Sequence, residues 1–155
     1  MPNTKNNILI YAIGNPARGD DGFGPAVLEQ LKLKNLKHAD FQVNYQLNIE
    51  DAELFSRYQL VIIIDAAKTS GGLQLKELQA EDKDPFSTHA LTPRQVLALS
   101  QNLYQKQFRC YILTTSGYNW DLGCEISESV EKDISLAIFL ILDFIKKELK
   151  TTFNQ

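Results

Sequence analysis

The chain has 155 residues, of which 44% are hydrophobic and 23% charged, and these values predict one globular domain spanning residues 1–155. A formal net charge of -3 argues against nucleic-acid binding, because neutralising phosphates requires a basic surface. Two cysteines without a zinc pattern, Cys110 and Cys124, and apolar runs shorter than the ~18 residues of a membrane span predict a cytoplasmic protein without a membrane partner.

The first half of the chain predicts an alternation of strands and helices. Residues 8–13 (ILIYAI) and 60–64 (LVIII) are continuous apolar runs, typical of strands that are buried on both faces of a parallel sheet. Between them we expect a helix over 25–34, a strand over 41–47 and a short helix over 50–58. This order predicts parallel strands joined by right-handed crossovers.

The second half predicts two more strands and two more helices. Residues 73–79 alternate with period two and predict an edge strand, which can run antiparallel to its neighbour. Thr92 and Pro93 suit the start of a helix that reaches about residue 105, residues 108–116 predict a strand, and Ser127 opens the last helix. We therefore expect an α/β fold, a three-layer α/β/α sandwich around a mostly parallel sheet of about five strands.

Acidic residues follow two of the predicted strands. The loop after 8–13 contains Asp20 and Asp21, and the strand 60–64 runs directly into Asp65. Ligands of open α/β sheets bind at the carboxyl ends of the strands, so Asp20 or Asp21 is expected to converge with Asp65 on one edge. Neither phosphate-binding glycine motif is present, and two carboxylates at a helix start favour a cation. The alternative is that Asp20 or Asp21 only caps the first helix.

Only two histidines are available as further ligands. His89 lies in the long loop 80–91 and could complete a site with Asp21 and Asp65, whereas His38 lies in a Lys-rich loop at the opposite edge and is expected to be solvated. Two carboxylates and an imidazole suit a first-row divalent metal, such as nickel, zinc, manganese or iron, with coordination positions left open.

The last third of the chain carries side chains for which two roles stay open. Tyr118 and Trp120 either line a peptide groove or pack over the sheet edge. Cys110 is expected to face the core, and Cys124 to be exposed without activation. The apolar stretch of the last helix is expected to cover one face of the sheet, and it could also dock a partner.

Three stretches of the chain together resemble a known enzyme family. They are Gly14-Asn15 followed by RGDDGFGP (residues 18–25), the apolar strand that ends in Asp65, and THALTP (residues 88–93). In this order they resemble the hydrogenase maturation protease family, the endopeptidases that process the large subunit of NiFe hydrogenases. The likeness spans most of the chain, from Ile8 to the final helix.

This resemblance implies an activity and a set of site residues. In the family, the second acid of the pair, the Asp after strand three and the loop His contact the metal, which implies metal-contacting and catalytic roles for Asp21, Asp65 and His89. Such proteases recognise a large-subunit precursor that already holds nickel and remove its C-terminal extension. The implied nickel is therefore supplied by the substrate, and the precursor is the implied partner. The three residues would position the scissile bond, and could polarise its carbonyl or activate a water.

Two other functions stay open at the level of sequence. A catalytically silent relative would bind the nickel-loaded precursor as a chaperone without cutting it. A phospho-acceptor receiver domain shares the acidic pair, the Asp after strand three and a following Thr or Ser, here Thr114, Thr115 or Ser116. The receiver is disfavoured because residues 14–19 separate the strand from the acidic pair and because no Lys ends the final strand. No HExxH or GxSxG motif is present, so a standard protease class is unsupported.

Overall fold

The computed structural model describes residues 6–68, 71–81 and 91–153 of the chain. Within these ranges five strands form one sheet in the order β2-β1-β3-β5-β4. The elements in chain order are β1 (Ile8–Ile13), the short 3-10 helix η1 (Gly19–Gly22), α1 (Phe23–Lys32), β2 (Ala39–Asn44), α2 (Asp51–Ser56), β3 (Leu60–Ala67), β4 (Gln74–Glu77), α3 (Pro93–Tyr104), β5 (Arg109–Ser116) and α4 (Glu128–Phe153). All strand pairs are parallel except β4 with β5, so the predicted α/β fold with an antiparallel edge strand is confirmed.

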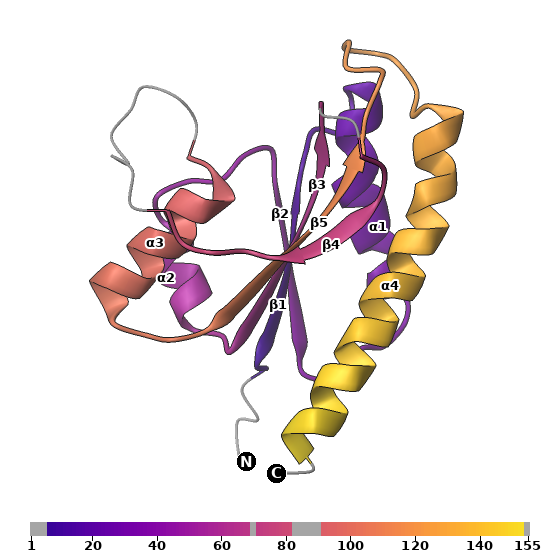
Figure 1. Cartoon of the computed structure of the whole chain (residues 1–155). Coiled ribbons are helices and arrows are strands. Elements are labelled where there is room, and N and C mark those ends of the chain that lie inside the picture. The colour runs from indigo at the N-terminus through magenta and orange to yellow at the C-terminus, as the bar shows by residue number, and fades with distance from the viewer. Residues whose placement is uncertain (1–5, 69–70, 82–90, 154–155) are drawn as a thin grey trace.

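Helices cover both faces of the sheet, with α1 and α4 on one side and α2 and α3 on the other (Figure 1). Every residue of β1 is buried, because successive side chains point to opposite faces and both faces are covered. Ile10 packs in the core with α1 and α4, whereas Tyr11 packs in the core with α2 and α3. This burial on two faces explains why the central strands are continuous apolar runs in the sequence.

Two strands differ in extent from their prediction. β2 spans Ala39–Asn44 rather than 41–47, because it pairs in register with the six residues of β1 and the Gly14 N–H then donates to the Asn44 carbonyl oxygen at 3.0 Å. β3 does not end before Asp65 but continues to Ala67, since β5 offers pairing partners along this whole length. Asp65 therefore lies within the strand.

Gly24 allows α1 to approach the sheet closely. A Cβ on Gly24 would lie 2.7 Å from the carbonyl oxygen of Ile64 and 2.8 Å from that of Ile13, which is too close for any larger side chain. Ile13 is the last residue of β1, and Ile64 lies in the carboxyl half of the neighbouring β3. The close approach therefore brings the start of α1 and the preceding η1 to the sheet edge where ligands bind in this class of fold.

The long helix α4 covers the sheet beside α1, as predicted. Ala137, Ile141 and Ile145 are buried against the sheet, whereas Leu136 and Phe139 are 56% and 66% exposed. Of the helices in the described ranges, none combines the length and apolarity that a membrane crossing requires.

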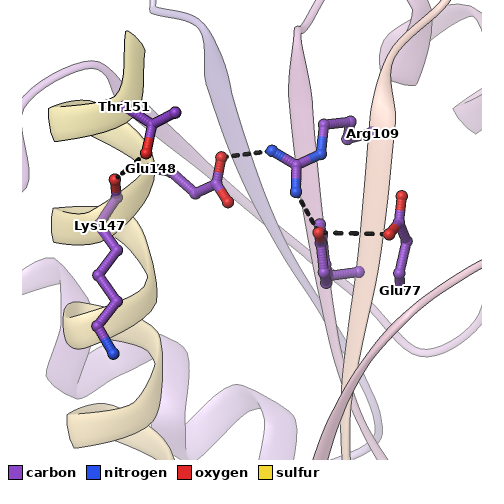
Figure 2. A network of polar contacts seen from close by, with 6 residues as sticks. Glu77, Arg109, Lys147, Glu148 and Thr151 are labelled. Carbon is purple, nitrogen blue, oxygen red and sulfur yellow. Dashed lines mark hydrogen bonds and ion pairs between the residues drawn. The ribbon is translucent and has the colours of Figure 1, made fainter. Parts of the chain in front are cut away.

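A polar network joins α4 to the strands at the amino end of β5 (Figure 2). The Arg109 guanidinium donates to the Glu148 carboxylate at 2.5 Å and also to the Tyr111 hydroxyl, which in turn lies 3.5 Å from the Glu77 carboxylate. Exposed ion pairs of this kind contribute about 0–1 kcal/mol. The network therefore orients α4 on the sheet more than it stabilises the fold, and it lies at the end opposite the carboxyl ends of the parallel strands.

Candidate functional site

The loop after β1 positions Asp21 at the carboxyl edge of the sheet. The Asn15 backbone N–H donates to Asp21 Oδ2 at 2.7 Å. Gly14 makes the turn that permits this contact, with φ of 145° and with the Asp21 carbonyl oxygen 1.8 Å from where a Cβ would stand. The N-cap of α1 is Gly22, and no side chain caps either η1 or α1. The alternative that Asp20 or Asp21 only caps the first helix is therefore wrong.

Asp65 lies within β3, directly beside the strand that leads into the Asp21 loop. Its side chain is half-buried. Burial raises the pKa of the Asp65 carboxyl to about 7, and repulsion from the Asp21 carboxylate adds to the rise, while the Ala66 N–H opposes it. The structure thus brings Asp21 and Asp65 together, close enough for one carboxylate to disfavour ionisation of the other.

The raised pKa of Asp65 predicts that the metal-free protein loses stability as the pH rises. The carboxyl has an ordinary pKa of 3.8 and a folded-state pKa of about 7, so between these values the folded state binds more protons than the unfolded state. The free energy of unfolding then falls with rising pH by on the order of 1 kcal/mol per pH unit, and the loss is complete above the folded-state pKa. Asp65→Asn lacks this titration.

Urea unfolding of both proteins in a chelator, between about pH 4 and about pH 8, tests this expectation. The variant should gain stability relative to the wild type across the window. A difference in unfolding free energy that does not change with pH would contradict it.

Asp20 has a different role from its neighbour. Its side chain is 0% exposed and accepts four hydrogen bonds, from Tyr118 N at 2.6 Å, Asn119 N at 3.0 Å, Ser127 N at 2.7 Å and Ser127 Oγ at 2.9 Å. Burial opposes ionisation of this carboxyl, but the donated hydrogen bonds outweigh it and hold the pKa of Asp20 below its usual value. Asp20 therefore ties the loop 117–127 to the loop after β1.

Residue spacing alone left Asp20 and Asp21 as alternatives, and only the family resemblance singled out Asp21; the structural role of Asp20 was not predicted. The donors stand 98 to 107 positions further along the chain, so no local pattern around the acidic pair reveals them. The role of Asn15, which holds Asp21 through its backbone N–H, was not predicted either. Almost every residue type has a backbone N–H, so the amino-acid sequence does not indicate which one donates.

The loop 117–127 carries the aromatic and cysteine candidates. Trp120 packs against the core cluster, and the Lys68 ammonium lies 5.5 Å from the centroid of its ring. Tyr118 is 66% exposed. Cys124 is exposed, as predicted, and Cys110 is buried in its strand, where burial raises the pKa of the thiol to about 12. Trp120 thus takes the packing role and Tyr118 does not.

Of the two histidines, His89 lies outside the described residues. The described chain resumes at residue 91, where the predicted start of α3 is confirmed by a reciprocal cap between Thr92 and Gln95. His38 lies at the opposite edge of the sheet, as expected, but it is half-buried rather than fully solvated, and its carbonyl oxygen accepts the N–H groups of Asn7 and Ile8. Among the described residues no group of three or more His, Cys, Asp and Glu side chains could hold a metal ion.

Comparison with known proteins agrees with the sequence resemblance. A provisionally named hydrogenase maturation protease of Methanocaldococcus jannaschii is 28% identical over an alignment 162 residues long, and the alignment covers 92% of this chain and 99% of that protein. No family model matches the chain.

Solved structures of named maturation proteases share the fold. The NiFe hydrogenase maturation protease HycI of Thermococcus kodakarensis superimposes with a TM-score of 0.74, at 23% identity, over 93% of this chain and 95% of that one. The hydrogenase maturating endopeptidase HybD of Escherichia coli superimposes with a TM-score of 0.69, at 17% identity, over 92% of this chain and 93% of that one.

These relatives are all named as proteases or endopeptidases, in agreement with the enzyme class predicted from sequence. At such identities the solved structures establish the fold, and the curated relative extends the likeness to the sequence over nearly the whole chain. The predicted resemblance is therefore confirmed: this chain is similar in sequence to the hydrogenase maturation proteases and has their fold.

Proposed function

We propose that this protein is an endopeptidase that removes the C-terminal extension of a nickel-loaded NiFe hydrogenase large-subunit precursor. The observation that carries the proposal is the pair Asp21 and Asp65, which converge at the carboxyl edge of a sheet with the fold of named maturation proteases. We propose further that the activity resides in one domain over residues 1–155 and is cytoplasmic, which the sparse cysteines support.

The electrostatics of the pair support a cationic ligand. Two carboxylates that repel one another, one of them with a pKa of about 7, gain from a cation placed between them, because it removes the repulsion and favours ionised Asp65. We propose that Asp21, Asp65 and His89 contact the nickel that the precursor carries. The metal is thus part of the substrate, and contact with it would hold the scissile bond beside the two carboxylates.

Asp65 is also suited to proton transfer. A carboxylate beside a reacting water can accept its proton, and contact with the nickel would keep Asp65 in the ionised form that this role requires. In this proposal Asp65 takes the proton of the attacking water, while the nickel positions and polarises the peptide carbonyl.

Incubation with the cognate precursor tests the proposed function. The purified protein is mixed with nickel-loaded and with nickel-free precursor from the same organism, and intact mass reports the C-terminus. We expect loss of the extension from the nickel-loaded precursor only. Cleavage of both forms would contradict the proposed recognition of nickel. If neither form is cleaved, the proposed endopeptidase activity is contradicted.

The same experiment separates the two alternatives. A chaperone of this fold would bind the nickel-loaded precursor and leave its mass unchanged. A receiver domain would bind neither form, and acetyl phosphate would label Asp65 stoichiometrically. The maturation proteases that this chain resembles are named as proteases or endopeptidases, which favours cleavage over both alternatives.

A further inference from the structure

We propose that the groove between α1 and β2 binds an extended, mainly apolar segment of the precursor, without acidic side chains, next to the scissile bond. This inference rests on the proposed function and specifies how the same site recognises its substrate. The groove lies at the edge of the sheet, and neither Asp21 nor Asp65 is among the residues that line it.

The groove is the larger cavity beside the candidate site, with a volume of about 720 Å³. This volume lies within the range of about 300–1,000 Å³ that is typical of ligand sites. Its walls come from the loop after β1, from α1, from β2 with the loop that follows it, and from the end of the loop 117–127. The lining residues are Gly14, Pro16, Gly22, Pro25, Ala26, Leu28, Glu29, Val43, Asn44, Tyr45, Gln46, Asn48 and Ile126.

The groove is continuous with the site. Gly22 follows Asp21 directly, and Gly14 contacts the Asp21 carbonyl oxygen across the turn, so one end of the groove lies at the backbone that holds this carboxylate. A peptide whose scissile bond reaches Asp21 must continue along the sheet edge on at least one side. The groove is the larger of the concave surfaces that the described residues provide at this edge, and it is the one that reaches the Asp21 loop.

Apolar side chains in the groove lack cover from the rest of the described chain. Val43, near the end of β2, is 40% exposed, and Tyr45, which directly follows β2, is 69% exposed. Val43 pairs with Ala12 and therefore lies on the α1 side of the sheet, on the same face as that core residue. Exposed apolar side chains that gather in a concave site are typical of ligand-binding surfaces.

The outer edge of β2 offers backbone N–H and C=O groups with which a peptide strand can pair. β2 is the first strand in the sheet order, and on its outer side no strand of the described residues pairs with it. An extended peptide can add to such an edge through backbone hydrogen bonds, with alternate side chains entering a neighbouring groove. The occupant is therefore an extended segment rather than a helix.

The wall of the groove is held rigidly. Tyr11 Oη donates to Asp51 Oδ2 at 2.8 Å and accepts from Asn44 Nδ2 at 2.8 Å, and the Asn48 N–H donates to the same Asp51 oxygen at 2.8 Å. These bonds tie the residues after β2 to the start of α2. A preformed wall lowers the ordering entropy that binding would otherwise cost.

The charged residues at the groove limit which peptide segment can bind there. Glu29 is the one charged residue among those that line the groove, and Asp21 stands just beyond its end. An acidic segment would be repelled by both, whereas an apolar segment that ends in a cationic centre at the scissile bond matches the groove and the carboxylate pair. The nickel of the precursor supplies that cationic centre under the proposed function.

Matched variants test the groove. Val43→Asp and Tyr45→Ala change exposed residues of the groove, and Leu136→Asp and Phe139→Ala make the same kind of change at exposed residues of α4 that do not line it. We expect each groove variant to raise KM for the nickel-loaded precursor about 10-fold with kcat within about 2-fold of the wild type, because the binding of a non-reacting segment is lost. The α4 variants should keep the wild-type KM.

The outcomes distinguish this inference from the proposed function. If the wild type does not process the precursor, the proposed function fails. If the wild type is active but the groove variants keep the wild-type KM, the groove inference alone is overturned. The same holds if the α4 variants raise KM as much as the groove variants do. A fall in kcat without a change in KM would also overturn it. Circular dichroism and urea unfolding are used to check that each of the four variants is folded.

Discussion

Asp20→Asn is expected to lower the free energy of unfolding by about 3 kcal/mol at neutral pH, because a buried carboxylate that accepts four hydrogen bonds is replaced by an amide whose NH₂ faces N–H donors. Hydrogen bonds to a charged acceptor contribute roughly 1.5–3 kcal/mol each and are not additive. Urea unfolding measures the loss. The amides of Tyr118, Asn119 and Ser127 should exchange faster with solvent, which locates the effect in the loop 117–127.

Asp21→Asn makes the same chemical change one residue away and serves as the matched control. The Asp21 carboxylate is half-buried and accepts one backbone N–H in the described structure, so this variant should lose about 1 kcal/mol or less. Ser127→Ala removes one donor to Asp20 and should be intermediate. Equal unfolding free energies for Asp20→Asn and Asp21→Asn would contradict the separate roles of the two acids.

Asp21→Asn and Asp65→Asn are each expected to reduce processing of the nickel-loaded precursor by at least about 100-fold while the protein stays folded. Each removes one of two carboxylates that would face the nickel, and a 100-fold loss corresponds to about 2.7 kcal/mol in the barrier, which is the size of effect seen when one group that stabilises transition-state charge is removed. The measurement is single-turnover processing read by intact mass. Asp121→Asn, at an exposed position of the loop 117–127, should keep wild-type activity.

Asp65→Asn separates stability from activity most clearly. Because burial disfavours the ionised form of Asp65, the neutral amide should make the metal-free protein at least as stable as the wild type at neutral pH while activity is lost. Wild-type activity in either Asp21→Asn or Asp65→Asn would contradict the assigned roles. A parallel loss of stability and activity in Asp65→Asn would indicate a structural role instead.

Sequence determined most of the sheet. The runs 8–13 and 60–64 predict central strands because a strand that is buried on both faces must be apolar at every position, and the structure places β1 and β3 side by side. The start of α3 at Thr92 and Pro93 is likewise encoded locally, since the cap is formed by residues three positions apart. Because β1 and β3 are neighbours, an acid in the loop after β1 is also expected to lie close to Asp65.

Tertiary structure gave Asp20 and Asp21 different surroundings, which their spacing in the sequence alone did not predict. Asp20 and Asp21 have the same side chain and adjacent positions, yet one is buried under the loop 117–127 and the other lies beside Asp65. The choice depends on partners about a hundred residues away, on the Gly14 turn and on the approach of α1 at Gly24. Periodicity and local spacing report burial and capping, but the direction of a side chain in a loop depends on long-range packing, and so does the pKa of Asp65.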